Sequence, residues 1–476
     1  MAERKLLIKN GRVVDPNGSQ EADLLIVGEK VQAVALRGTL PIGEETEVIN
    51  AEGLLVLPGL IDPHLHFNSP FMGTCTVHGF GTGSVAAAWG GITTVIDFST
   101  QNKGESILKN LEQKEEEAKD SCIDWSLSGI LLDAEPQTLK EIPRLIQEGI
   151  PTNKCFTTYK HSGRLMSDEG MLKILEVTAS HGGMLMVHCE HDALIDYRVQ
   201  KALESGKYEP IQHAYTRPVE AERMAVNRVI ELVQEVPAPL YLAHISAAAS
   251  IPLIRTAQEQ GLPVYAETCT HYLCLTEEAL LKSEGQLFIC SPPLRKELDQ
   301  KALWKALKAG ILEIVSSDDA GVPPEDNLRI GAGRFDRVPS GMSGLEARLY
   351  ILYTEGVAKG RISLEKLVEL TATRPAERFG LAPEKGRLVP GADADLVLYD
   401  PRPRWTMSAT NLHMNTSFCP FEGWTIQGKI HSVFSRGEYL IRNSEFVGRP
   451  GRGRRIFRRL KGTTPSLDPF IQKFFL

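Results

Sequence analysis

The stretch LLVLPGLIDPHLHF, residues 54–67, runs from an apolar segment straight into a His-x-His pair. Its first eight residues are typical of a buried β-strand, and Asp62, His64 and His66 follow at once. Residues at i and i+2 of an extended chain face the same side, so the two imidazoles can reach one ion. A barrel enzyme carries its chemistry at the carboxyl ends of its strands, and this stretch fits the first strand of such a barrel.

Seven further strand-like segments follow, separated by helical patterns such as EAERMAVNRVIELVQEV (220–236). They are TTVIDF (93–98), IDWSLSGIL (123–131), TNKCFTT (152–158), MLMVHC (184–189), PLYLAHI (239–245), PVYAET (263–268) and ILEIVS (311–316). Strands that alternate with helices indicate a parallel sheet. Eight such units predict an α/β fold, a closed (β/α)₈ barrel of the TIM type.

Both chain ends carry short apolar runs bounded by turn residues, including KLLIK (5–9), LVLYD (396–400) and SVFSRGEYLI (432–441). We expect them to form small antiparallel strands of one β-sandwich, with the barrel inserted between its halves. The predicted parts are a sandwich from residues 1–56 and 386–447, a barrel at 57–385, and a basic tail at 448–476. We expect the tail to contact a neighbouring subunit.

The composition is that of a soluble globular protein: 476 residues, 42% hydrophobic and 24% charged, with a net charge of −7. This charge gives no indication of a nucleic-acid partner. No apolar stretch reaches the roughly 18 residues of a membrane span, and the first residues do not resemble a signal peptide. The eight cysteines include no CxxC pair, so we expect reduced thiols and a cytoplasmic location.

Ligand-type side chains recur at the ends of the predicted strands. Besides the His-x-His pair these are Lys154, His188, His244 and Asp318. Each has an ordinary explanation by itself: a lone histidine is usually a hydrogen-bonded core residue, an aspartate can cap a helix, and a lysine can extend to solvent. Six such residues at the strand ends of one predicted barrel favour a metal site instead.

Lys154 lies in an apolar stretch, where desolvation lowers a lysine pKa and leaves a neutral, nucleophilic amine. A protonated lysine cannot bind a metal. The neutral amine, in contrast, can react with CO₂ to give an anionic carbamate with two oxygens. Such a bridging ligand would allow two cations to lie about 3.5–4 Å apart.

At these residues the sequence resembles the dihydropyrimidinase/hydantoinase family of the amidohydrolase superfamily, and the likeness covers nearly the whole chain. The segments that carry it include PGLIDPHLHF (58–67), GTGSVAAAWGGITTVIDF (81–98), NKCFTTYK (153–160), MVHCE (186–190), ETCTHYL (267–273), CSPPLR (290–295) and TATRPAERFGLAPEKGRLVPGADADLVLYDP (371–401).

The resemblance implies a role for each site residue. His64, His66, carboxylated Lys154 and Asp318 would hold one divalent metal, and Lys154, His188 and His244 the other. Zinc suits these ligands best, with manganese, cobalt or nickel as substitutes. Tyr159 would polarise the substrate carbonyl, while Ser291 and the backbone near Ser340 would bind the cyclic amide. A metal-bridging hydroxide would open the ring of a hydantoin or dihydropyrimidine, with Asp318 as general base.

Several residues depart from the family pattern. Asp319 replaces a usual histidine, and Ser340 a usual asparagine, while Cys155 and His271 look more like allantoinases. Allantoinase is therefore the alternative activity. Asn68 replaces the arginine usual in dihydroorotases and argues against that activity.

A non-catalytic scaffold is the rival from another class, and the complete ligand set opposes it. We expect a homotetramer or homodimer, a small-molecule substrate, and no nucleic-acid or membrane partner. Five other histidines are expected at the surface or in supporting positions: His78, His161, His181, His191 and His213.

Overall fold

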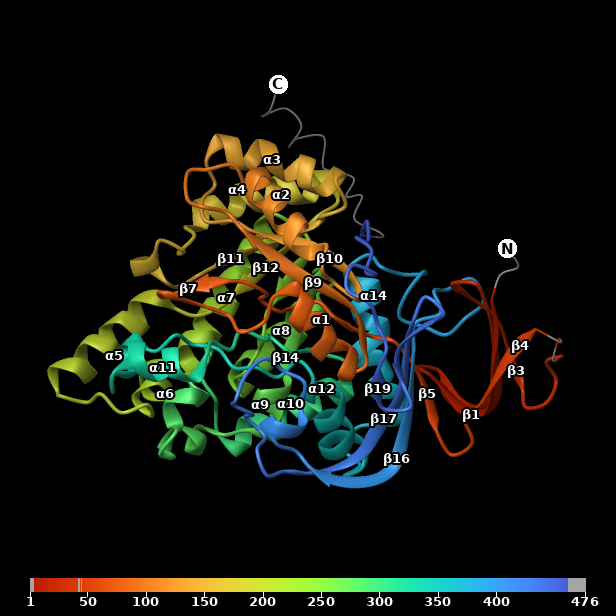
Figure 1. Ribbon diagram of the computed structural model, residues 1–476. Helices are drawn as coiled ribbons and strands as arrows, with labels where there is room; N and C mark the ends of the chain where they lie inside the picture. The colour runs from red at the N-terminus through yellow and green to blue at the C-terminus, as the bar shows by residue number, and fades with distance from the viewer. Residues whose placement is uncertain (1–3, 42, 44, 461–476) are drawn as a thin grey trace.

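The computed structural model describes residues 4–41, 43 and 45–460, and it shows a barrel beside a second, curved sheet (Figure 1). The barrel sheet has the strand order β15-β14-β13-β12-β11-β10-β9-β6, and every pair in it is parallel. The strands are β6 (Leu60–Asp62), β9 (Ile92–Thr100), β10 (Asp124–Ile130), β11 (Thr152–Phe156), β12 (Met184–His188), β13 (Leu240–Leu242), β14 (Val264–Cys269) and β15 (Ile314–Ser316). The predicted eight-stranded α/β barrel is confirmed.

Helices surround the barrel strands and follow them along the chain (Figure 1). They are α1 (Phe80–Trp89), α2 (Ile107–Ala118), α3 (Pro136–Gln147), α4 (Asp168–His181), α5 (Asp192–Glu204), α6 (Gln212–Thr216), α7 (Val219–Glu235), α8 (Ile251–Glu259), α9 (Thr270–Cys274), α10 (Glu297–Ala309), α11 (Pro324–Gly331), α12 (Ala347–Ile351), α13 (Leu364–Val368) and α14 (Arg374–Arg378).

The seam between β15 and β6 is closed by backbone hydrogen bonds just beyond the strands. The Asp318 N–H donates to the His64 carbonyl at 2.9 Å, and the His66 N–H donates to the Asp319 carbonyl at 2.9 Å. Leu65 and Asp319 form an isolated parallel bridge at the same place. The first and last strands of the barrel thereby bring the His-x-His pair against Asp318, although more than 250 residues separate them.

The opening apolar stretch divides between two sheets. β5 (Leu55–Pro58) pairs antiparallel with β16 (Leu396–Thr406) in the second sheet, and β6 begins the barrel after Gly59. A Cβ at Gly59 would lie 2.2 Å from the Thr93 hydroxyl oxygen, so only glycine permits this close approach. Strands from both chain ends thus share one sheet, which agrees with the prediction that the two ends form one module.

The second sheet has nine strands, in the order β19-β18-β17-β16-β5-β1-β2-β3 with β4 beside β1. Its remaining strands are β1 (Lys5–Asp15), β2 (Gly18–Val27), β3 (Lys30–Leu36), β4 (Thr46–Asn50), β17 (Thr425–Ser435), β18 (Glu438–Arg442) and β19 (Glu445–Phe446). The expectation of antiparallel pairing throughout is wrong, because β1 pairs parallel with β4 and with β5. The first half of β1 pairs with β4 and the second half pairs with β5. Asn10, with φ 62°, lies between the two halves.

The start of the predicted tail lies against this chain's own barrel. Trp125 of β10 donates its N–H to the Arg454 carbonyl at 2.9 Å, and the Ile456 N–H donates to the Trp125 carbonyl at 2.7 Å. Arg458 is fully buried and donates to the Ser126 hydroxyl at 2.8 Å, the Leu127 carbonyl and the Thr152 hydroxyl at 3.0 Å. The segment therefore packs against the barrel strands as far as residue 460. The rest of the tail is outside the described residues, and its contact with another subunit stays a prediction.

Replacing Arg458 by alanine is expected to destabilise the fold by roughly 2–4 kcal/mol, since it leaves a cavity and several buried acceptors without a donor. The neighbouring Arg459→Ala, an exposed side chain, is the matched control. Thermal unfolding of both variants is the measurement. Equal unfolding temperatures for the two would contradict the structural role of Arg458.

None of the helices in the described part of the chain has the length and apolar character needed to cross a membrane. All eight cysteines are unpaired, and only Cys75 is exposed, in agreement with the predicted thiols.

Candidate active site

Three of the predicted site residues have a left-handed backbone. Tyr159 has φ 70°, His244 φ 37° and Asp318 φ 46°, and each follows a barrel strand: β11, β13 and β15. Residues with a β-carbon rarely adopt this conformation, and such strain gathers at functional sites. The backbone at the strand ends is therefore shaped to turn these side chains toward one mouth of the barrel.

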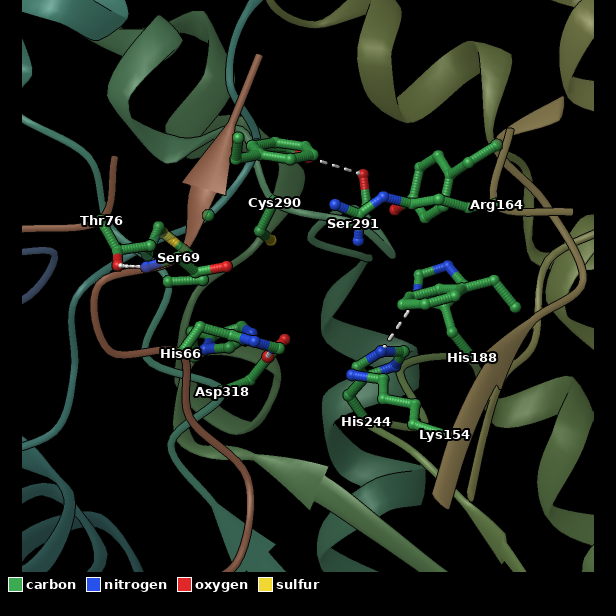
Figure 2. Close-up of a pocket in the computed structure, with 18 residues that line it drawn as sticks. His66, Ser69, Thr76, Lys154, Arg164, His188, His244, Cys290, Ser291 and Asp318 are labelled. Atoms are coloured by element: carbon green, nitrogen blue, oxygen red, sulfur yellow. Dashed lines mark hydrogen bonds and ion pairs between the residues drawn. The ribbon is translucent and has the colours of Figure 1, made fainter. Parts of the chain in front are cut away.

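The six predicted ligands lie together there, and Figure 2 shows all of them except His64, which lies beside Asp318. Lys154 Nζ lies 2.7 Å from His64 Nε2, and His188 Nδ1 lies 3.0 Å from His244 Nε2. Asp318 Oδ1 lies 3.2 Å from His64 Nε2 and 3.4 Å from His66 Nε2. Ligand atoms of His64, His244 and Asp318 all lie within 4.8 Å of one another. Nitrogen and carboxylate donors this close together fit divalent metal ions.

Burial keeps the four imidazoles neutral. Desolvation lowers the pKa of His66 and His188, and places those of His64 and His244 well below their usual value. A neutral imidazole retains the lone pair that binds a metal. Burial would raise the pKa of Asp318, but its contacts with His64 and His66 and the nearby Lys154 hold it well below its usual range. The donor set is thus in the protonation state that a cation requires.

Two of these histidines are oriented by buried glutamates that sequence reasoning missed. Glu190 accepts from His188 Nε2 at 2.8 Å, which leaves Nδ1 facing His244. Glu267 accepts from His64 Nδ1, which leaves Nε2 facing Lys154. Carboxylates behind histidine ligands fix the tautomer and raise ligand basicity. Both residues lie in motifs at strand ends, MVHCE and ETCTHYL, which was the available signal.

Glu190→Gln is expected to weaken metal binding by about 10–100-fold, because a neutral amide no longer polarises His188. Arg217, now paired with the Glu190 carboxylate, would also lose its counter-ion. Chelator competition on the purified variant measures the change. Glu220→Gln, at an exposed position on α7, is the control. A metal affinity equal to that of the control would remove Glu190 from this role.

Lys154 is almost completely buried, with 2% of its surface exposed. Burial lowers its pKa to about 8, and its Nζ lies 4.8 Å from the Phe98 ring centroid. A substantial neutral fraction near physiological pH makes the amine nucleophilic. The surroundings therefore suit the carboxylation that the sequence predicts for this lysine.

The predicted substrate-binding residues line the same pocket. Burial raises the pKa of Tyr159 to about 12, so its phenol keeps its proton and can donate a hydrogen bond. Ser291 Oγ lies 3.3 Å from Ser340 Oγ and 3.3 Å from His213 Nε2. His213 is buried and also donates to the Cys290 carbonyl at 2.9 Å, so it supports this wall of the pocket.

Asp319, which departs from the family pattern, does not join the ligand set. Its Oδ2 accepts from the backbone N–H groups of Gly344 at 2.8 Å and Leu345 at 3.0 Å. The carboxylate thereby holds the segment after Met342, a residue that itself lines the pocket. His78, expected at the surface or in a supporting position, is fully buried and interacts electrostatically with Asp319.

A (β/α)₈ barrel with four histidines, a buried lysine and an aspartate at its strand ends defines a metal-dependent hydrolase. Residues 55–440 match the amidohydrolase family. D-hydantoinases from Geobacillus stearothermophilus and Streptomyces coelicolor are 41% and 38% identical over 96% and 94% of this chain, and 97% of each relative is covered. The crystal structure of dihydropyrimidinase from Brevibacillus agri superposes with a TM-score of 0.93 at 41% identity, covering 96% of this chain and 99% of that one.

The chain belongs to the amidohydrolase family and, within it, to the hydantoinase and dihydropyrimidinase group, as the motifs indicated. It is a metal-dependent cyclic amidohydrolase.

Proposed function

We propose that this protein hydrolyses the ring amide bond of hydantoins or dihydropyrimidines and releases N-carbamoyl amino acids. One observation carries the proposal: the donor side chains of Tyr159, Ser291 and Ser340 share a pocket with Lys154 and the histidines. A flat cyclic amide can there reach hydrogen-bond donors and metal ligands at once. The names of the relatives, D-hydantoinase and dihydropyrimidinase, support this substrate class and do not favour an allantoinase.

The metal centre is proposed from the donor set. His64, His66 and Asp318 would hold one ion, His188 and His244 the other, and Lys154, carboxylated by CO₂, would bridge them. Two divalent ions, with zinc the best match to these donors and manganese, cobalt or nickel as substitutes, would supply hydroxide at neutral pH.

The side chains of Tyr159, Asp318 and Ser291 would stabilise charge, transfer the proton and hold the substrate. The Tyr159 phenol donates to the carbonyl oxygen as negative charge develops on it, a contribution that is usually among the largest in such reactions. Asp318 accepts a proton during the attack and returns it to the leaving ring nitrogen. The Ser291 hydroxyl and the backbone near Ser340 hold the amide edge of the ring, which keeps the reacting carbon close to Asp318.

Initial rates of the metal-replete enzyme on hydantoin, 5-methylhydantoin, dihydrouracil, allantoin and dihydroorotate test the function. We expect a hydantoin or dihydropyrimidine to be hydrolysed at least ten times faster than allantoin. Stoichiometric metal by elemental analysis would oppose a scaffold role. Allantoin faster by more than tenfold, or no hydrolysis at all by metal-replete protein, would overturn the proposal.

We further propose a homotetramer or homodimer, supported by the apolar end of the sequence, PFIQKFFL (469–476). Light scattering of the full chain and of a chain ending at residue 460 measures the assembly. The shorter chain preserves the contacts of Arg458 under the barrel, so a loss of subunits would be due to the removed segment. An unchanged mass would exclude that segment from the contact.

A further inference from the structure

Arg164 lies beyond β11 and lines the same pocket as the metal ligands and Tyr159 (Figure 2). Its guanidinium carbon is 5.6 Å from the ring centroid of Phe156 and 5.8 Å from that of Phe71. Phe156 belongs to β11, whereas Phe71 belongs to the hairpin of β7 (Pro70–Phe71) and β8 (Thr74–Cys75). Two rings from separate segments therefore hold this cation at the pocket wall.

The guanidinium has no carboxylate partner among the described residues. Burial lowers the pKa of Arg164, and among the groups that the structure describes only Tyr159 opposes this. Arg217 provides the contrast in the same neighbourhood, because the buried Glu190 neutralises it. A cation partly withdrawn from water without a counter-ion is costly, and an anion that enters the pocket would relieve that cost.

The rest of the pocket also favours an anion. Within the described part of the chain, Asp318 is the only acidic residue that lines it, and its carboxylate faces His64 and His66. Tyr159 places the reacting ring, and its ring centroid is 5.8 Å from that of Phe156. Phe156 therefore lies beside both the tyrosine and Arg164. A substituent on the ring carbon can extend from the reaction centre along Phe156 to the guanidinium.

We propose that Arg164 selects substrates whose ring carbon carries an acidic side arm, that is, carboxyalkyl hydantoins or the corresponding dihydropyrimidines. The planar guanidinium can donate two parallel hydrogen bonds to a carboxylate, which gives specificity as well as affinity. The inference rests on the proposed function and names the substrate class of the same site.

Matched substrates test it. Hydantoin-5-acetic acid and hydantoin-5-propionic acid each have a primary amide of nearly the same shape and no charge. Rates are measured for both enantiomers of all four compounds, with 5-methylhydantoin as the reference. We expect the wild type to show a kcat/KM at least tenfold higher for one of the acids than for its amide.

Three variants isolate the guanidinium. Arg164→Met removes the charge and keeps an apolar side chain between the two rings, and it should lower kcat/KM for the preferred acid by about 10–100-fold, the usual effect of a charge-assisted hydrogen bond. The loss for the acid should exceed that for the amide by at least tenfold. Arg164→Lys should recover part of the acid preference. Lys160→Met removes an exposed charge nearby and should leave the acid-to-amide ratio unchanged.

The possible failures can be told apart. Hydrolysis of 5-methylhydantoin without any acid preference would overturn the role of Arg164 and leave the proposed function intact. Equal losses for acid and amide in Arg164→Met would show that the residue only packs between Phe71 and Phe156, and this also overturns the inference. Failure to hydrolyse any hydantoin or dihydropyrimidine would overturn both.

Discussion

Replacing Lys154 by alanine is expected to remove bound metal and to lower kcat by about a thousandfold or more, the scale on which a metal-activated nucleophile contributes. Lys154 is buried among His64, Phe98 and Phe156. A protonated amine at that position would repel two divalent cations at short range in a site of low dielectric constant. Carboxylation would replace the positive charge with a negative one and would offer oxygen ligands to the ions.

Elemental analysis and initial rates on the same samples measure the two losses together. Lys154→Arg should be equally inactive, because guanidinium stays charged and does not react with CO₂. Adding propionate or acetate with metal to the alanine variant should restore part of the activity, since a short carboxylate can fill the gap. Lys160→Ala, at an exposed position, is the control for loss of a lysine. An unmodified Lys154 in crystals of active enzyme with both metals bound would contradict the mechanism.

Replacing Asp318 by asparagine is expected to lower kcat by about 10²–10⁴-fold while the protein stays folded. Asparagine tolerates the left-handed backbone at this position, φ 46°, better than most residues do. It can also occupy the same volume beside His64 and His66. It cannot accept a proton, so the transfer to the leaving nitrogen is lost.

The measurement is kcat together with metal content and the thermal unfolding temperature. A loss of turnover that exceeds the loss of metal would separate proton transfer from metal binding. Asp120→Asn, exposed at the surface, controls for the change in net charge. A variant with nearly wild-type kcat and full metal content would remove Asp318 from the role of base.

Sequence reasoning could bring the candidate ligands together because each lies in or just after an apolar run that makes a strand, and barrel geometry dictates that strand ends meet. The same reasoning could not find Glu190 and Glu267 as supporting groups. An acidic residue near a strand end has many uses, and only the distances to His188 and His64 define this one. Arg164 was equally out of reach, since nothing local shows that a charge lacks a partner.

The split of residues 54–61 between two sheets was likewise beyond local reasoning. The run is uniformly apolar, and the division depends on the pairing of β5 with β16, more than 330 residues later. The contacts of Arg458 with the barrel strands are of the same kind, because nothing in a basic tail shows which acceptors its arginines will meet.

By itself, the sequence determined the barrel, the order of its strands and six candidate metal ligands, because periodicity and strand-end chemistry are local properties of the chain. Tertiary structure alone decided which atom of each histidine faces the site, where Asp319 directs its carboxylate and which arginine is left without a counter-ion. Those outcomes depend on distances between groups far apart in the sequence. They also depend on burial, because a buried charge or donor without a partner costs free energy.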